Sequence, residues 1–282
     1  MTSLLPTNRA PRRRSVLPGF GMSAAITSLV MTALVIIPLS VLAWRAASLG
    51  PTDFLAAAWT PRARAAYAVS LGASLAAAIV SSVAGLLVAW VLVRINFPGR
   101  RLLDSLVDVP LALPTAVAGL VYSTLYVEKG WLGRFLVPLG IRGAYSWLGI
   151  VLVLVFVSLP FAIRVVQPVL ESLDRDTEEA ARMLGASRTQ TFLKVIFPTI
   201  FPAVLTGFAL ALARALGEYG SVVFISGNMP FKTEIAPVLI VSRLEEFAYA
   251  EATAIAVVLL VMSISLLVVV NWLQQRVARN AQ

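Results

Sequence analysis

The sequence predicts an all-α polytopic membrane protein with about six transmembrane helices. Apolar residues make up 59% of the 282 positions and charged residues 13%, which is about half the charged fraction of a soluble domain. The mean hydropathy is +0.87. Several apolar runs also reach the roughly 20 residues that a helix needs to cross the hydrocarbon core of a bilayer.

The chain contains no cysteine and no histidine. Without cysteine it has no disulfide framework and no thiol chemistry. Without histidine it lacks the commonest metal ligand, the commonest general base and the usual pH switch. The net charge of +9 fits cytoplasmic loops that face anionic lipid. We therefore expect neither a metal site nor a catalytic residue in this chain.

A basic arm, residues 1–21, precedes the first apolar run, residues 22–44. A cleaved signal peptide is the alternative interpretation of such a start. The run is too long for the apolar region of a signal peptide, however, and it lacks a clear cleavage site with small residues. We therefore interpret it as the first transmembrane span.

Six spans are predicted within a transmembrane domain of residues 22–272, followed by a tail, residues 273–282. The second span is rich in Ala, Ser and Gly, which let helix backbones approach closely, so we expect it to be buried among other spans. If the amino terminus is inside, thirteen Lys and Arg residues near the span ends lie on the cytoplasmic side and eight on the outside. This excess predicts that both termini are cytoplasmic. The spans lie at residues 22–44, 67–93, 105–127, 147–170, 199–226 and 252–272.

The third span contains DVPLALPTAVAGL, with Pro110 and Pro114 beside Thr115. A proline inside a helix leaves carbonyl groups unpaired, which membrane helices tolerate where protein or water satisfies them. The segment is either a broken helix beside a translocation path or an ordinary kinked and packed helix. The pattern leaves both open, and we take all three residues as candidate path residues.

The fifth span ends in RALGEYGSVVFISGN, which places Arg214 and Glu218 four residues apart on one helix face. Charged side chains at such depth normally point towards a partner or a wet cavity. One interpretation is an ion pair that fixes helix packing, and the other is a gate or an anion-attracting element. Because Arg precedes Glu along the helix, we expect only a weak pair. Tyr219 and Ser221 join the candidate path residues.

Residues 228–252 follow, and their apolar residues predict a short helix lying at the membrane surface. The segment is either a plain connecting loop or a contact for an extracytoplasmic solute receptor. The apolar positions concerned are Phe231, Ile235, Val238 and Leu239.

A polar segment between the fourth and fifth spans, within residues 171–198, predicts a hairpin of two short helices. Asp176 with Glu179, and Ser187 with Gln190, fit two capping boxes. Gly185 between them is typical of a helix stop. A solvated linker is the alternative, but a projecting hairpin with an apolar face needs a groove in which to lie. No part of this chain supplies that groove, so we expect another polypeptide to do so.

The hairpin resembles the EAA signature of importer-type ABC transporter permeases. EAARMLG begins at Glu179, and VIFP ends at Pro198. Val195 and Phe197 stand where the family pattern has Ile and Leu. The resemblance implies a type I ABC importer permease architecture, in which this loop docks on the ATP-hydrolysing subunit. It implies that motion driven by the nucleotide passes through Glu179, Ala180, Ala181, Gly185 and Pro198.

The chain contains no Gly-Lys-Ser/Thr sequence, the phosphate-binding pattern of many ATPases. We therefore expect no enzyme activity in this chain. ATP and Mg²⁺ would be bound by a partner ATPase.

Two further stretches of sequence restrict the resemblance to one branch of this permease family. FPGRRLLDSLVDVPLALPTAVAGLVYSTLY and ARALGEYGSVVFISGNMPFKTEIAPVLI are similar to the T-type permeases of bacterial sulfate/thiosulfate importers. Such a permease lies in the bacterial inner membrane. The resemblance implies three kinds of partner: a homologous W-type permease, two ATPase subunits and a periplasmic sulfate- or thiosulfate-binding protein.

Other functions stay open at this point. A permease for molybdate or another oxyanion would share much of the pattern, and the preference between sulfate and thiosulfate is undetermined. An ion-gradient-driven secondary transporter would need deep ionisable groups, for which Asp108 and Glu218 are the candidates, and it would leave the hairpin unexplained. A membrane enzyme using Ser74 would lack a histidine base. Whether the assembly is a heterodimer or a homodimer also stays open.

Overall fold

The computed structural model describes residues 20–280, so the basic arm falls outside them except for its last two residues. Every regular element in that range is a helix, which confirms the predicted fold class. The first half contains α1 (Phe20–Met31), η1 (Thr32–Ile36), α2 (Ile37–Ala47), α3 (Pro51–Ala58), α4 (Pro61–Arg94), α5 (Arg100–Val107), α6 (Val109–Ala112), α7 (Thr115–Tyr126), α8 (Gly133–Leu136) and η2 (Val137–Leu139). The second half contains α9 (Trp147–Ser172), α10 (Arg175–Met183), α11 (Arg188–Thr191), η3 (Phe192–Ile196), α12 (Phe197–Leu216), α13 (Val222–Ile225), α14 (Ala236–Glu245) and α15 (Tyr249–Asn280).

Five continuous helical runs are long and apolar enough to cross a membrane, and a sixth span is broken. The broken span combines α5 and α6 with α7 and bends by 107°. Each predicted span therefore corresponds to a span of the structure. The continuous runs are Phe20–Ala47, Pro61–Arg94, Trp147–Ser172, Arg188–Leu216 and Tyr249–Arg276.

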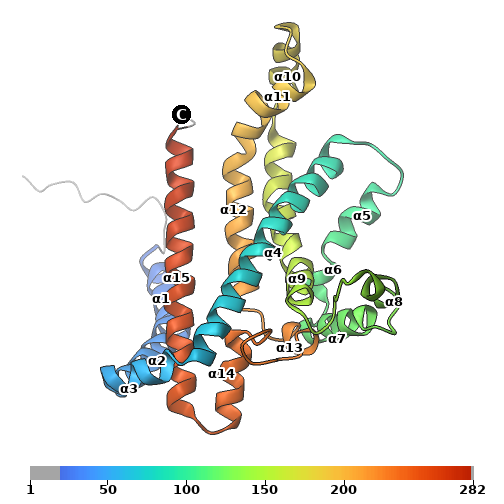
Figure 1. Cartoon of the computed structure of the whole chain (residues 1–282). Helices are drawn as coiled ribbons and strands as arrows, with labels where there is room; N and C mark the ends of the chain where they lie inside the picture. The colour runs from blue at the N-terminus through green and yellow to red at the C-terminus, as the bar shows by residue number, and fades with distance from the viewer. Residues whose placement is uncertain (1–19, 281–282) are drawn as a thin grey trace, which may run out of the picture.

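The centre of the molecule is the packing of α4 against α9 and α12 (Figure 1). Small residues on one face of α4 make this possible: a Cβ added at Gly85 would lie 2.8 Å from the Cβ of Ala162 on α9. The opposite face of α4, with Ile79, Val83 and Leu87, is exposed. The second span is thus buried on its small-residue face only, which corrects the expectation that it is enclosed by other spans.

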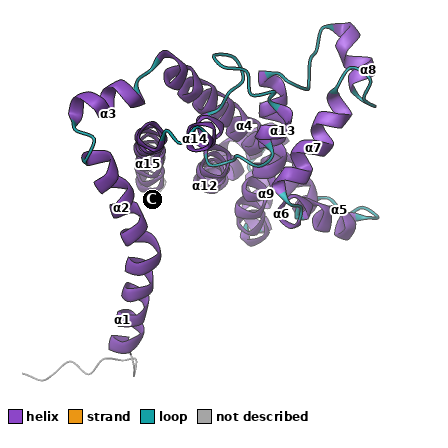
Figure 2. Cartoon of the chain, turned by 90° about the horizontal axis from the view of Figure 1, so that it is seen from below, coloured by secondary structure: helices purple, strands orange, loops and turns teal. Residues whose placement is uncertain are grey.

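The first span, α1 to α2, stands apart from the central helices (Figure 2), and none of its most apolar stretch is buried. It reaches the rest of the chain where α2 and α3 pack against α15. The last span, α15, also packs against α12 and α14, so it links the first span to the centre.

Two prolines account for the break in the third span. Pro110 lies in the first turn of α6, and Pro114 lies directly before the first residue of α7. A helix start tolerates proline because the missing N–H would have no partner there. The structure therefore confirms a broken helix in place of a merely kinked one, and its position beside a translocation path stays a prediction.

The fifth span differs from its predicted bounds, 199–226, at both ends. It begins at Arg188, because α11, η3 and α12 form one continuous run. It ends at Leu216, and the turn of residues 217–221 separates it from α13. The predicted hairpin is therefore joined directly to this span, without a linker.

Candidate functional site

The hairpin, α10 and α11, projects beyond the ends of the central helices at the top of Figure 1. Its first helix begins at Arg175, and the Asp174 carboxylate accepts a hydrogen bond of 3.0 Å from the backbone N–H of Asp176. The predicted capping box of Asp176 with Glu179 is therefore wrong, because the capping residue lies two positions earlier. Glu179 is an exposed residue inside the helix.

The turn between α10 and α11 is closed as predicted. Gly185 has a φ of +84°, a conformation that costs glycine little and other residues much. The backbone N–H of Ala186 bonds to the carbonyl oxygen of Ala181 at 3.1 Å, as in a Schellman motif. The second capping box is confirmed, since the Ser187 and Gln190 side chains each accept from the other's backbone N–H.

The tip of the hairpin is apolar and exposed. Met183 and Leu184, at the end of α10, are each 89% exposed. Ala180 and Pro198 are also exposed, and Ala181 is partly buried. Met183 and Leu184 are absent from the predicted site residues. Their position directly before Gly185, which ends the helix, could have predicted an apolar tip.

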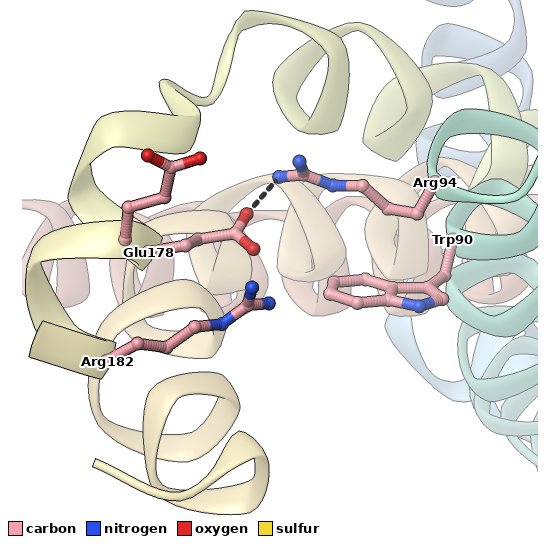
Figure 3. Close-up of a pocket in the computed structure, with 5 residues that line it drawn as sticks. Trp90, Arg94, Glu178 and Arg182 are labelled. Atoms are coloured by element: carbon pink, nitrogen blue, oxygen red, sulfur yellow. Dashed lines mark ion pairs between the residues drawn. The ribbon is translucent and has the colours of Figure 1, made fainter. Parts of the chain in front are cut away.

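An ion pair joins the hairpin to α4. The Arg94 Nη2 and Glu178 Oε1 atoms lie 2.6 Å apart, with the two side chains 11% and 13% exposed (Figure 3). Their angles do not suit a hydrogen bond, so both atoms lack a hydrogen-bond partner among the described residues. The Arg94 guanidinium also lies 5.7 Å from the centre of the Trp90 ring. A cavity of about 290 Å³ opens here, lined by Trp90, Arg94, Glu178, Glu179 and Arg182.

The other candidate region lies at the opposite end of α12, in the turn of residues 217–221. Glu218 is 3% exposed and pairs with Arg214. Its second oxygen accepts hydrogen bonds of 2.9 Å from the backbone N–H and the hydroxyl of Ser221. Because α12 ends at Leu216, Glu218 does not share a helix face with Arg214. The predicted pair forms, but through a turn.

The broken span contacts this turn closely. A Cβ added at Gly119 would lie 2.1 Å from the carbonyl oxygen of Ser221, and one at Gly220 would lie 2.4 Å from the Thr115 hydroxyl. The structure thus brings Thr115 together with the turn that holds Glu218 and Ser221. Tyr219 is exposed beside them, whereas Pro110 lies on the far side of the break.

Arg164 of α9 binds the segment before the break. Its Nε and Nη2 atoms donate to the Asp108 carboxylate at 2.9 and 2.6 Å. Its Nη1 atom donates to Asp104 at 2.6 Å. Sequence reasoning treated Asp108 as a lone deep carboxylate and missed Arg164, because the partners are 56 and 60 residues apart.

A third long-range pair joins α4 to the segment before α14. Arg62 donates to both oxygens of Glu234, at 2.8 and 2.7 Å. A short helix, α14, is present in this segment as predicted. Val238 and Leu239 are buried, and Leu239 packs with Tyr67 and Ile255, whereas Phe231 before the helix is exposed. The position of α14 at the membrane surface stays a prediction. No three acidic side chains within residues 20–280 come close enough to hold a metal ion.

A family model described as a binding-protein-dependent transport system inner membrane component matches residues 81–282. The sulfate transport system permease protein CysT of Synechocystis is 48% identical over 278 residues, covering 98% of this chain and 97% of the relative. CysT of Escherichia coli is 46% identical over 267 residues, covering 95% and 96%. A probable cysT of Nephroselmis olivacea is 50% identical over 250 residues, covering 89% and 88%.

Solved structures share the fold. A bacterial alginate ABC transporter in complex with an alginate pentasaccharide-bound periplasmic protein matches with a TM-score of 0.74 and 18% identity, covering 92% of this chain and 95% of that one. The methionine ABC transporter MetNI matches with a TM-score of 0.54 and 17% identity, covering 79% and 99%. The chain therefore belongs to the family of inner-membrane components of binding-protein-dependent transport systems, within its CysT group, and has the fold of ABC importer permeases.

Proposed function

We propose that this chain is the membrane-spanning permease subunit of a sulfate importer in which a separate subunit hydrolyses ATP. The observation that carries the proposal is the similarity, 46–48% identity over almost the whole chain, to proteins named as sulfate transport permeases. The break in the third span and the turn of residues 217–221 lie in the two stretches whose sequences resemble T-type permeases.

The exposed tip of the hairpin supports ATP coupling. Met183 and Leu184 present apolar side chains at the end of a projecting helix, and such a surface is suited to a groove in another protein. Around it lie the proposed coupling residues Glu179, Ala180, Ala181 and Gly185, with Pro198 at the start of α12. The partner subunit would bind ATP and Mg²⁺ and carry out the hydrolysis.

The other partners follow from the family. Its description names dependence on a binding protein, and the alginate transporter was solved with a periplasmic one. We propose a periplasmic sulfate- or thiosulfate-binding protein, a homologous W-type permease and two ATPase subunits as partners. The assembly would lie in the bacterial inner membrane with both termini of this chain in the cytoplasm.

The turn of residues 217–221 and the start of α7 are the proposed translocation path or gate. Glu218 neutralises Arg214, so the turn holds no free positive charge that would bind a dianion tightly. Hydroxyl and backbone groups of Thr115 and Ser221 remain as weak polar contacts, and a conducting path needs contacts weak enough to release the ion. Pro110 and Pro114 would shape the path through the break, beside Tyr219.

The first test is uptake of labelled sulfate by cells that lack this chain and then receive it back. Uptake should return with the wild-type chain, stop when ATP is depleted and survive loss of the proton gradient. Loss with the proton gradient alone would instead indicate a secondary transporter. Entry of molybdate without sulfate would be consistent with the ABC mechanism but would contradict sulfate as the transported solute.

Gly185→Val and Gly185→Asn test the role of the hairpin in the same assay. Valine is strained at a φ of +84°, whereas asparagine tolerates that conformation several times better than other residues. We expect the valine variant to lose uptake and the asparagine variant to keep most of it. Equal uptake by the two variants would contradict a coupling role for the turn.

A further inference from the structure

We propose that Arg94 is a positioning residue that transmits movement of the hairpin to α4 through Glu178. The inference rests on the proposed function, because it assumes that an ATPase subunit moves the hairpin. It adds a residue that lies outside the EAA signature, at the end of a different span.

The first helix of the hairpin has few attachments to the rest of the chain. Helix α10 packs against α11 and η3, the elements that follow it directly. Among the side chains that the structure describes, the pair of Arg94 with Glu178 is the one ion pair that links the hairpin to another span. Both side chains are nearly covered, so water and salt screen the pair less than an exposed one.

Helix α4 is suited to carry movement away from this contact. Its neighbour α9 contains Pro160 and Pro168, and α12 contains Pro202 and follows the π-helical segment η3. Prolines and π segments remove or shift backbone hydrogen bonds and are where helices bend. Helix α4 has 34 residues, and Pro61 in its first turn is its one proline.

The far end of α4 is held close to the other candidate region. Arg62 binds both oxygens of Glu234, and the Ser70 hydroxyl accepts a hydrogen bond of 2.7 Å from the backbone N–H of Ala236. The segment containing Glu234 follows the turn of residues 217–221 by way of α13. A displacement of Arg94 can therefore be transmitted along the uninterrupted helix α4 towards the proposed gate.

Figure 3 shows Arg182 pointing into the cavity that Arg94 and Glu178 line. No acid lies within ion-pair distance of Arg182 among the described side chains. Glu178 and Arg182 line this cavity from α10, and Arg94 lines it from α4. Only the cation on α4 connects the hairpin to a different span, so the two arginines have different expected roles.

The test uses the complete transporter reconstituted with its solute-binding protein, and measures the ratio of solute-stimulated to basal ATP hydrolysis per assembled complex. Arg94→Glu and Glu178→Arg should each reduce that ratio by about tenfold, within the usual range of coupling between sites. The double exchange, R94E with E178R, should restore it. Arg101→Glu is the matched control: it reverses an exposed charge on α5 that has no ion partner among the described side chains, and it should leave the ratio unchanged.

Single variants that keep the wild-type ratio would overturn the proposal, as would a double exchange that assembles but fails to recover. If the charge reversals do not assemble, Arg94→Gln and Glu178→Gln supply the same comparison, and failure of these to assemble would assign the pair a purely structural role. A wild-type complex without solute-stimulated hydrolysis would instead contradict the proposed function itself.

Discussion

The two ends of α4 are held by ion pairs of different kinds. At the end near α14, Arg62 makes two hydrogen bonds to Glu234, whose side chain is 3% exposed. At the hairpin end, Arg94 and Glu178 make one close approach whose angles do not suit a hydrogen bond. The first geometry is that of a fixed joint, because two parallel bonds define an orientation. The second has no such pair of hydrogen bonds to set the orientation of the two groups.

The surroundings of the two ends of α4 also differ, in how closely the neighbouring residues pack. Near α14, Tyr67 of α4 packs with the buried residues Leu239 and Ile255, and the Ser70 hydroxyl accepts a hydrogen bond from the backbone N–H of Ala236. The hairpin is instead stabilised by hydrogen bonds within its own helix caps. Its tip carries the exposed residues Met183 and Leu184. We infer that the α14 end supplies stability, and that the hairpin end is kept adjustable for contact with a partner.

The largest expected effect on stability is that of Arg62→Ala. It leaves the buried Glu234 without its cation and should lower the free energy of unfolding by about 3 kcal/mol, the low end for one partner of a buried pair because Arg62 is partly exposed. Thermal unfolding in lipid nanodiscs measures this. Arg94→Ala should cost less than half as much, and an equal or larger loss there would contradict the contrast between the two ends.

A matched control for Arg62→Ala removes both charges. The double variant with Arg62→Met and Glu234→Leu should recover most of the lost stability, since a buried pair can often be replaced by apolar residues. A double variant as unstable as the single one would mean that Arg62 acts through packing and not through its charge.

Gly119→Ala tests the close contact between α7 and the turn of residues 217–221. The added Cβ would lie 2.1 Å from the Ser221 carbonyl oxygen, so backbone must move, at a cost of about 1–3 kcal/mol. Gly72→Ala on α4 is the control, because its Cβ would meet nothing within 4 Å, and alanine should stabilise that helix slightly. Similar unfolding temperatures for the two variants would mean that this close contact, unlike the α14 end of α4, contributes nothing to stability.

Ser187→Ala should have a smaller and local effect. It removes the acceptor for the backbone N–H of Gln190, and loss of such a cap costs about 1 kcal/mol. Hydrogen exchange should therefore become faster in α11 and unchanged in α4. Ser187→Asp keeps an acceptor and should exchange like the wild type. Faster exchange throughout the chain would mean that the hairpin contributes to global stability.

Leu184→Ser should have the smallest effect on stability, within about 0.5 kcal/mol, because the side chain is exposed. Uptake should nevertheless fall severely, since the substitution makes the apolar tip polar. Leu139→Ser, at a residue 73% exposed elsewhere in the chain, is the control and should keep both stability and uptake. Normal uptake with L184S would argue against the tip as a docking surface.

Local patterns predicted the elements of this chain well. Apolar run length located the spans, Pro110 and Pro114 marked the break, and Gly185 marked the hairpin turn. The cap of α10 was misplaced because two aspartates, Asp174 before the helix and Asp176 in its first turn, lie near its start, and the spacing rule does not choose between them. The fifth span was predicted to extend too far at its carboxyl end because VVFI continues its apolar composition across the turn.

The ion pairs could not be predicted in the same way. Arg62 and Glu234 are 172 residues apart, and which charges meet depends on how helices are rotated and shifted against each other. Arg164 lay unnoticed in an apolar span for the same reason. Glu178 was overlooked in favour of its neighbour Glu179, since only the orientation of α10 decides which of the two faces Arg94.

The length of α4 also determines how the chain meets the bilayer. Its 34 residues correspond to about 51 Å, at about 1.5 Å per residue. Even when inclined by about 40°, near the upper limit for membrane helices, it would span about 39 Å, more than the roughly 30 Å of hydrocarbon. Its two arginine-bearing ends therefore reach the headgroup region. Bilayer thickness, which changes the inclination of long helices, becomes a physical variable that acts on both ends at once.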